Sequence, residues 1–185
     1  MYQITEWCRH FIRQQVKPGD LCIDATMGNG HDTEFLCSLV GDQGQVLAFD
    51  IQEQALIQTQ KKLQESRTPQ NYRLILDSHS HMNHYADIST VSCITFNLGY
   101  LPGGDHTLAT QPDTSIEAIT QGLSLLKKDG LLTLCIYSGG DTGFAERDAL
   151  LPYLKALPPK EYLVILSSYY NRPHHPPIPV LIRKL

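Results

Sequence analysis

Hydrophobic residues occur in two kinds of segment that alternate along the chain. Short runs rich in β-branched and aliphatic residues predict strands, and longer segments with hydrophobic residues every three or four positions predict helices. The clearest helix covers 114–127, where Ile116, Ile119, Leu123 and Leu126 are spaced by 3, 4 and 3 residues. Because such spacing places the four side chains on one helix face, this helix is expected to pack against a sheet.

The same pattern gives the remaining elements. The expected strands are Leu21–Thr26, Gln45–Asp50, Tyr72–Ser78, Val91–Leu98, Leu131–Tyr137, Glu161–Tyr170 and Ile178–Arg183. The expected helices are Ile4–Gln15, Asp32–Val40, Gln52–Ser66, His81–Ile88, Thr114–Lys127 and Gly143–Lys155. Repeated alternation of strand and helix predicts βαβ crossovers, and hence a mainly parallel sheet with helices on both faces.

The end of the chain departs from this alternation. Only residues 171–177 join the last two expected strands, which is too short for a crossover helix. The two strands must therefore form a hairpin, and the last strand runs antiparallel. We predict one domain over residues 1–185, with an α/β, Rossmann-like, doubly wound sheet of seven strands that is mostly parallel. An antiparallel C-terminal hairpin is typical of class I methyltransferases, whereas a dehydrogenase Rossmann domain normally keeps its sheet parallel.

Composition narrows the class of protein. The 185 residues are 42% hydrophobic and 18% charged, which suits a folded domain with its own core rather than a disordered chain. The formal net charge of −4 argues against a broad basic face that coats nucleic acid. No apolar run approaches the roughly 20 residues that a bilayer-spanning helix needs, so no membrane association is expected.

Two further features predict a cytoplasmic protein. Glu6, Arg9 and Arg13 interrupt any hydrophobic signal-peptide segment near the start of the sequence. The five cysteines include no CxxC pair, and each lies within an apolar stretch. Buried free thiols in a reducing compartment are therefore expected.

Polar residues end the first four expected strands. These residues are Asp24, Asp50, Asp77 and Asn97. Each alone is typical of a helix cap or a turn, but ligands of open α/β sheets bind beyond the carboxyl ends of the strands. Four such residues at one edge therefore predict a ligand site there.

The loop after the first strand favours a cationic ligand. Gly28 and Gly30 allow a sharp turn close to a ligand. Dinucleotide-binding loops carry a third glycine, where this chain has Thr33, and the upstream Asp24 would repel a pyrophosphate. S-adenosylmethionine (SAM), with its sulfonium and ammonium groups, therefore fits this loop better than NAD. The carboxylate of Asp50 suits two ribose hydroxyls, and the segment at Asp77 suits an adenine edge.

The segment after the fourth strand carries candidate methyl-transfer chemistry. The sequence FNLGYLPGGD (96–105) is similar to the (D/N)PPY loop of amino-methylating enzymes. The side-chain oxygen of Asn97 and the main-chain carbonyl of Leu98 can accept hydrogen bonds from a substrate nitrogen and orient it toward the methyl group. Tyr100 is a candidate for stacking on a base.

With DATMGNGHDT (24–33), this segment resembles the rRNA methylase family, also called YtqB-like or MnmM, over essentially the whole chain. The resemblance implies a SAM-dependent enzyme that methylates 5-aminomethyl-uridine at the wobble position of tRNA, with the anticodon region as its partner. The implied SAM-binding residues are Asp24, Met27, Gly28, Asn29, Gly30, His31, Asp32, Thr33, Asp50, Ile51, Gln52, Asp77, Ser78, His79 and Asn97. The implied reaction residues are Asn97, Leu98, Tyr100, Asp105 and His106, with Asp105 or His106 as proton relays.

The sequence departs from the family pattern at two places. Residues 137–141 replace an expected histidine-containing, glycine-rich segment, and His106 stands where a lysine is expected. The histidines at 79, 81 and 84 have no cysteine at ligand spacing, so no metal is expected. The His174-His175 pair is interpreted either as part of a stiff surface loop or as a wall of the substrate cleft.

Several alternatives stay open at this point. The acceptor is either tRNA, rRNA or a small amine, and the rival classes are an NAD-dependent oxidoreductase and a non-catalytic RNA-binding module. Arg9, Arg13 and Lys17 are spaced to touch phosphates from one helix. Trp7, Phe11 and Ile12 on that helix pack either on the sheet or on a second subunit, so a homodimer is also an option.

Overall fold

The computed structural model describes residues 4–99, 111–137 and 140–185. Its strands are β1 (Leu21–Asp24), β2 (Gln45–Asp50), β3 (Tyr72–Leu76), β4 (Val91–Leu98), β5 (Leu126–Ile136), β6 (Tyr162–Leu166) and β7 (Ile178–Lys184). Its helices are α1 (Ile4–Gln15), α2 (His31–Val40), α3 (Glu53–Glu65), the 3₁₀ helix η1 (His79–His84), α4 (Pro112–Leu125) and α5 (Gly140–Ala156).

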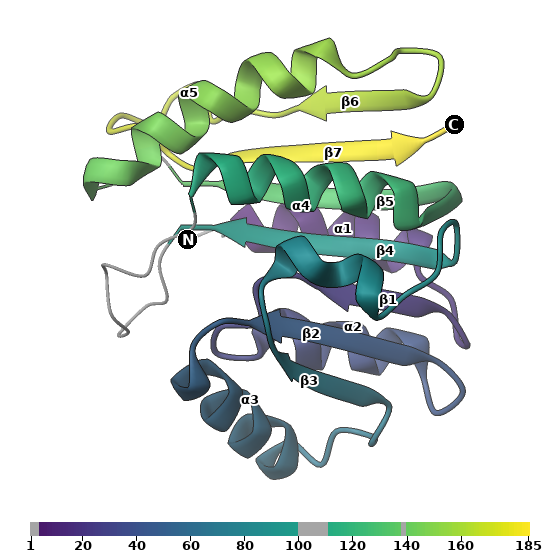
Figure 1. Ribbon diagram of the computed structural model, residues 1–185. Coiled ribbons are helices and arrows are strands. Elements are labelled where there is room, and N and C mark those ends of the chain that lie inside the picture. The colour runs from purple at the N-terminus through teal and green to yellow at the C-terminus, as the bar shows by residue number, and fades with distance from the viewer. Residues whose placement is uncertain (1–3, 100–110, 138–139) are drawn as a thin grey trace.

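The strands form one seven-stranded sheet in the order β3-β2-β1-β4-β5-β7-β6 (Figure 1). Neighbours from β3 to β5 pair in parallel, whereas β7 pairs antiparallel with both β5 and β6. The predicted mostly parallel sheet and its antiparallel C-terminal hairpin are therefore confirmed.

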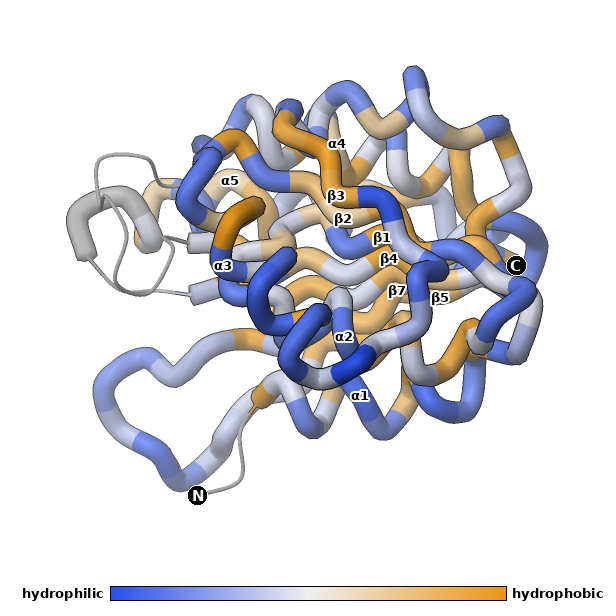
Figure 2. Tube along the Cα trace, turned by 90° about the horizontal axis from the view of Figure 1, so that it is seen from below, coloured by the Kyte–Doolittle hydropathy of each residue, from blue (hydrophilic) through white to orange (hydrophobic). Residues whose placement is uncertain are grey.

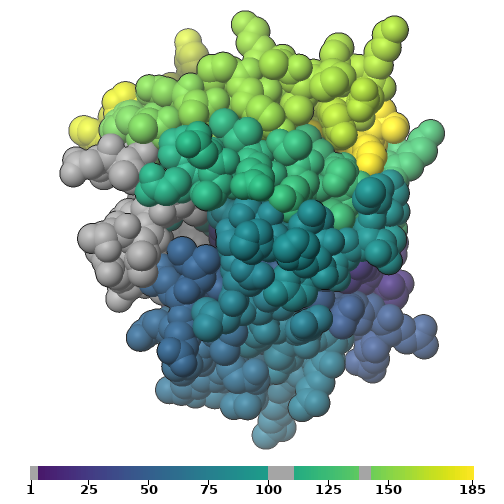
Figure 3. All heavy atoms as spheres, viewed as in Figure 1, coloured from purple at the N-terminus to yellow at the C-terminus, as the bar shows by residue number. Residues whose placement is uncertain are grey.

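Helices cover both faces of this sheet. In Figure 1, α4 and η1 lie in front of the strands, and α1 and α2 lie behind them. The front core contains the fully buried Phe96, Met82 and Ile119, and the rear core contains Ile12 and Leu36. Hydrophobic positions follow the strands through the interior in Figure 2, and Figure 3 shows α4, α5 and η1 forming one continuous surface over the front.

Several predicted boundaries were wrong, and three of these differences have a local physical reason. The expected helix 81–88 is the shorter 3₁₀ turn η1, because it starts on the capping Ser78 and ends where Tyr85 leaves helical geometry. The expected helix 114–127 ends at Leu125, and β5 begins at Leu126, which pairs with Val91. The sixth strand ends at Leu166 rather than at Tyr170, because the backbone pairing with β7 extends no further than the contact of Ser167 N–H with Pro179 O.

The described part of the chain has no helix long and apolar enough to cross a membrane. All five cysteines are buried and free, as predicted.

The helix that begins at the ligand-side loop is held at its other end by Asn71. The Nδ2 group of Asn71 donates to the carbonyl oxygens of Cys37 and Gly41, at 2.9 Å each. Asn71 is only 7% exposed, so water cannot readily replace it. One amide thereby satisfies carbonyls that the end of α2 leaves without helical partners.

Replacing Asn71 by Ala should lower the free energy of unfolding by about 1–3 kcal/mol, because the substitution leaves these carbonyls without a donor. Denaturant unfolding measures the change. The exposed Ser38, whose hydroxyl bonds within its own helix, provides the control variant Ser38→Ala. An equal loss in the two variants would contradict the proposed role of Asn71.

Candidate functional site

Parallel pairing brings the ends of the first four strands to one edge of the sheet. Asp24, Asp50 and Asn97 lie in or at the ends of β1, β2 and β4, and Asp77 directly follows β3. The backbone N–H of Asp77 donates to the carbonyl of Asp50 at 3.0 Å, which joins two of these ends directly. The four residues therefore lie along a single edge, as the sequence predicted.

The loop between β1 and α2 is folded against the end of β2. The N–H of Met27 donates to Phe49 O at 2.9 Å, and the N–H of Gly28 donates to the Asp50 carboxylate at 3.0 Å. Gly30 ends the loop with a φ of 75°, a left-handed conformation that glycine adopts without strain.

Thr59 of α3 packs against this loop and forms a hydrogen bond with it, a role that the sequence did not reveal. Its hydroxyl donates to Gly28 O at 3.0 Å. A Cβ atom on Gly30 would lie 2.9 Å from both the Cγ2 and Oγ1 atoms of Thr59, which is too close for a real contact. Glycine is therefore required at position 30 by both the backbone angle and the packing.

Asp24 is completely buried at the start of the loop. Its carboxylate accepts hydrogen bonds from the Thr33 hydroxyl at 2.7 Å and from the N–H of Thr26 at 3.2 Å. Burial, followed by the negative charges of Asp32 and Asp50, raises its pKa to about 7. Such an arrangement favours a ligand that brings positive charge, as the sulfonium and ammonium of SAM do, and disfavours a pyrophosphate.

Asp50 ties two loops together and still has room for a ligand. One carboxylate oxygen accepts the N–H of Gly28 and the other accepts the N–H of Gln52, each at 3.0 Å. Because a carboxylate offers about four acceptor positions, two remain for ribose hydroxyls. The neighbouring Ile51 is 57% exposed and offers an apolar surface beside them.

Asp77 has more protein partners than the sequence suggested. Its carboxylate accepts from Ser78 N–H at 2.7 Å, from His81 Nδ1 at 2.7 Å and from the Tyr85 hydroxyl at 2.9 Å. The hydrogen bond from His81 is the largest of the effects that lower the pKa of Asp77. His81 therefore serves this carboxylate, and within the described residues no group of three potential metal ligands occurs.

His79 lies beneath the loop. Its Nδ1 is 3.2 Å from Ala25 O, and since a carbonyl only accepts, Nδ1 carries the proton. Burial lowers the pKa of this histidine, so the neutral ring is favoured. His79 therefore supports the backbone of the site as a neutral donor.

Asn97 is held by two side chains from the first loop and α2. Its backbone N–H donates to the Thr26 hydroxyl at 2.7 Å, and its Nδ2 donates to Asp32 Oδ2 at 2.8 Å. The side chain of Leu98 is fully buried, which leaves only its main chain for a role at the edge. Thr26 was within the quoted motif, but its contact with a residue 71 positions away has no sequence signal.

The remaining predicted residues differ in what the structure says of them. Asn29 is half-buried in the loop before α2, and His31 is exposed at the start of α2. Tyr100, Asp105 and His106 lie outside the described residues. Their expected roles therefore stay predictions.

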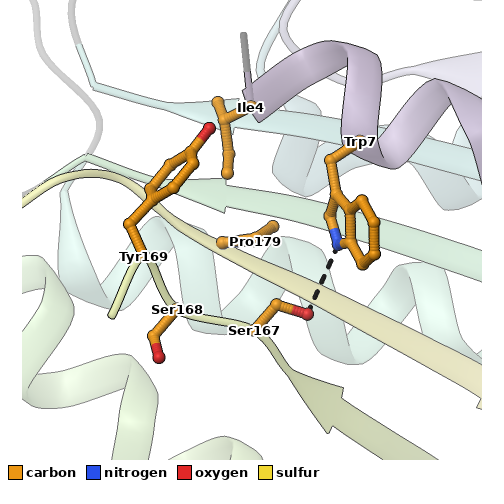
Figure 4. A pocket seen from close by; sticks show the side chains of 6 residues that line it. All are labelled: Ile4, Trp7, Ser167, Ser168, Tyr169 and Pro179. Carbon is orange, nitrogen blue, oxygen red and sulfur yellow. Dashed lines mark hydrogen bonds between the residues drawn. The ribbon is translucent and has the colours of Figure 1, made fainter. Parts of the chain in front are cut away.

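The N-terminal helix faces the sheet rather than solvent. Ile12 is buried in the rear core, and Phe11 packs against it. Trp7 lines a hollow of about 290 Å³ between α1 and the segment after β6 (Figure 4), and its Nε1 donates to Ser167 at 3.3 Å. Packing on the sheet thus accounts for Phe11 and Ile12.

The His174-His175 pair lies in the loop that joins β6 to β7. Both residues are exposed and have positive φ angles, and the ring of His175 meets that of Phe144 on α5 edge-on at 5.2 Å. Since β6 runs parallel to β5, this loop lies at the same edge of the sheet as the candidate site.

The chain was compared with known proteins. The profile of the family described as "Putative rRNA methylase" matches residues 46–183. An Arabidopsis thaliana relative is named "tRNA (mnm(5)s(2)U34)-methyltransferase, chloroplastic". It is 32% identical over an alignment 189 residues long, which covers 97% of this chain and 69% of that protein. The chain belongs to this rRNA methylase family.

Solved structures agree with membership of the rRNA methylase family. A Clostridium thermocellum "putative rRNA-methylase" is 42% identical, with a TM-score of 0.96 and coverage of 100% of this chain and 99% of that one. A Streptococcus mutans "putative methyltransferase", solved in complex with SAH, is 39% identical, with a TM-score of 0.90 and the same coverage. The family resemblance and the class I methyltransferase fold predicted from sequence are confirmed.

The buried Asp24 makes a testable contribution to stability. Its pKa is higher in the folded protein than in an unfolded chain, so between about pH 4 and 7 the folded state binds more protons. Folding stability from this group therefore falls as pH rises through that window. In Asp24→Asn the fall is absent, and the melting temperature of the variant relative to the parent should rise with pH.

Thermal unfolding without ligand at pH 5 and pH 8 measures this trend, and each kcal/mol corresponds to about 2–4 °C for a chain of this size. The exposed Asp42, replaced by Asn, corrects for the loss of one surface carboxylate. A relative melting temperature that falls with pH would show that Asp24 is stabilised, not penalised, as an anion.

Proposed function

We propose that this chain methylates the aminomethyl nitrogen of 5-aminomethyl-uridine at the wobble position of tRNA, with SAM as the methyl donor. The observation that carries the proposal is the fixed amide of Asn97, beside a buried acidic loop that favours a cation. The printed name of the Arabidopsis relative, which specifies a modified U34 of tRNA, supports this acceptor.

The chain is a SAM-dependent methyltransferase of class I. The residues that would hold the donor are the loop from Asp24 to Gly30, Asp50 at the ribose, and the segment at Asp77 near the adenine. SAM supplies an electrophilic methyl group on a positively charged sulfur. The protein's part is to bind the two reactants and align them.

Asn97 is proposed to orient the attacking amine. With Nδ2 bound to Asp32, the amide oxygen of Asn97 remains as an acceptor. An alkyl ammonium, with a pKa near the lysine reference of about 10.4, is mostly protonated at neutral pH and cannot attack. The site must therefore favour the neutral amine, and Asp105 or His106 are the proposed acceptors of its proton.

The rival functions meet specific objections. A dinucleotide would place its pyrophosphate near the buried Asp24, against a loop whose third glycine position is occupied by Thr33 of α2, which disfavours an NAD-dependent oxidoreductase. A non-catalytic RNA-binding module would need no side chain that fixes the amide of Asn97. Methylation of rRNA or of a small amine fits the same site and is separated from the proposal by experiment.

In the deciding experiment, purified protein is incubated with radiolabelled SAM and each of four acceptors in turn. These are tRNA bearing 5-aminomethyl-uridine, the same tRNA without the modification, rRNA and a small alkyl amine. Methyl transfer to the first alone is expected, and the product nucleoside is identified by mass spectrometry. Preferred transfer to rRNA or to the small amine would overturn the proposed acceptor.

Asp50→Ala should weaken SAM binding by about 10- to 100-fold, because it removes a charged acceptor for the ribose hydroxyls. SAM stabilises the parent by mass action, so a smaller ligand-induced rise in melting temperature reports the change. The variant Asp50→Asn keeps one acceptor for the Gly28 or Gln52 N–H and should bind SAM with intermediate affinity. Unchanged affinity in Asp50→Ala would remove Asp50 from the donor site.

Asn97→Ala should leave SAM affinity within a few-fold and lower the methyl-transfer rate by about 100-fold or more, the scale for losing one preorganised polar group. Single-turnover transfer to aminomethyl-uridine tRNA measures the rate, and SAM binding is measured separately. A near-parental rate would mean that Asn97 only ends a strand.

A further inference from the structure

Asn97 can present either of two chemically opposite atoms to a substrate. Its oxygen accepts hydrogen bonds, whereas its nitrogen donates them, and the two exchange places when the amide rotates by half a turn. A neutral amine that must keep its lone pair free is oriented by an acceptor. The protein therefore needs a device that fixes which way this amide points.

Asp32 provides that device. A carboxylate only accepts, so the atom of Asn97 that lies 2.8 Å from Asp32 Oδ2 must be the nitrogen. The side chain of Asp32 is only 12% exposed, which limits competition from water. The oxygen of Asn97 is thereby turned away from Asp32.

Asp32 is itself held by Arg9, from a helix outside the alternating strand–helix core. The Nε and Nη2 groups of Arg9 both donate to Oδ1 of Asp32, at 2.9 and 2.7 Å. Oδ2 is left for Asn97, so the two oxygens have separate partners. Arg9 also donates to His31 O at 3.0 Å, which fixes it to the start of α2.

The spacing of Arg9 with Arg13 suggested contacts with RNA phosphates, but the guanidinium of Arg9 is engaged within the protein. Its side chain is 19% exposed, and Glu6 lies 3.0 Å from its Nη1. The helix that carries it is anchored by the buried Ile4, Cys8 and Ile12. The backbone that carries Arg9 is therefore held in place, and Asp32 is the carboxylate at the site that its guanidinium orients.

We infer that Arg9 is a positioning residue that acts through Asp32 to keep the Asn97 oxygen facing the substrate amine. The inference rests on the proposed function for its consequence in catalysis. The contacts between the three side chains are independent of that function. Without Arg9, Asp32 can rotate and Asn97 loses the partner that distinguishes its two orientations.

Arg13 offers a matched control on the same helix. Both guanidinium groups lie 4.9 Å from the centre of the Phe35 ring, and both face Glu6. The two residues differ at Asp32, with which Arg9 forms an ion pair at 2.7 Å. Arg9→Ala and Arg13→Ala therefore remove equal charge and the same contact with the Phe35 ring, but they differ in burial, at 19% against 50% exposed, and in the link to Asn97.

The first measurement follows the Asn97 side-chain amide by ¹H–¹⁵N NMR in the protein without substrate. Arg9→Ala should shift its two N–H signals and speed their exchange with water, whereas Arg13→Ala should leave them near their parental positions. Unchanged signals in Arg9→Ala would overturn the inference. This measurement decides the question even if the protein transfers no methyl group to tRNA, an outcome that would overturn the proposed function alone.

The second measurement is a double-mutant cycle in single-turnover methyl transfer to aminomethyl-uridine tRNA. Arg9→Ala should slow transfer by about 10- to 100-fold with SAM affinity within a few-fold, and Arg9→Lys should restore part of the rate. In the Asn97→Ala background, Arg9→Ala should have almost no further effect. An equal slowing in both backgrounds, or an equal slowing by Arg13→Ala, would show that Arg9 acts on the fold in general.

Discussion

A carboxylate removed from water must receive hydrogen bonds or positive charge from the protein, and this requirement organises the ligand edge. Asp24 receives a hydroxyl and a backbone N–H, Asp50 receives two backbone N–H groups, and Asp32 receives Arg9 and Asn97. Each of these three acids thus also joins neighbouring elements of the fold. The same hydrogen bonds therefore determine both the charge of the site and its shape.

The sequence predicted the parts of this arrangement that repeat or end a pattern. The alternation of strands and helices follows from periodicity, the final hairpin follows from the short 171–177 connection, and the gathering of the strand-end acids follows from the parallel sheet. Thr59 was missed, and Arg9 was interpreted as a candidate phosphate contact, because their roles depend on contacts with residues 31 and 23 positions away in the sequence. The end of α4 was misplaced because Leu125 and Leu126 are equally buried, so hydrophobicity alone does not mark the boundary.

The charge balance at the edge favours a cationic ligand over a pyrophosphate. Asp24, Asp32 and Asp50 place negative charge around the glycine loop, and Arg9 offsets that of Asp32 alone. A pyrophosphate would add repulsion to the Asp24 carboxylate, which burial already destabilises. If the sulfonium of the donor binds near Asp24, as proposed, it would offset part of the cost of burying this carboxylate.

The residues proposed to bind the donor and those proposed to recognise the acceptor lie in different parts of the fold. The groups that favour a cationic donor lie on β1, β2 and the loops that follow them, where their partners are protein atoms with little freedom to change. The groups proposed to recognise the acceptor begin with Asn97 near the end of β4, where both its main chain and its side chain have protein partners. Substrate preference can therefore change through residues beyond Asn97 while the donor site stays intact, provided that Asp32 continues to hold the amide in one orientation.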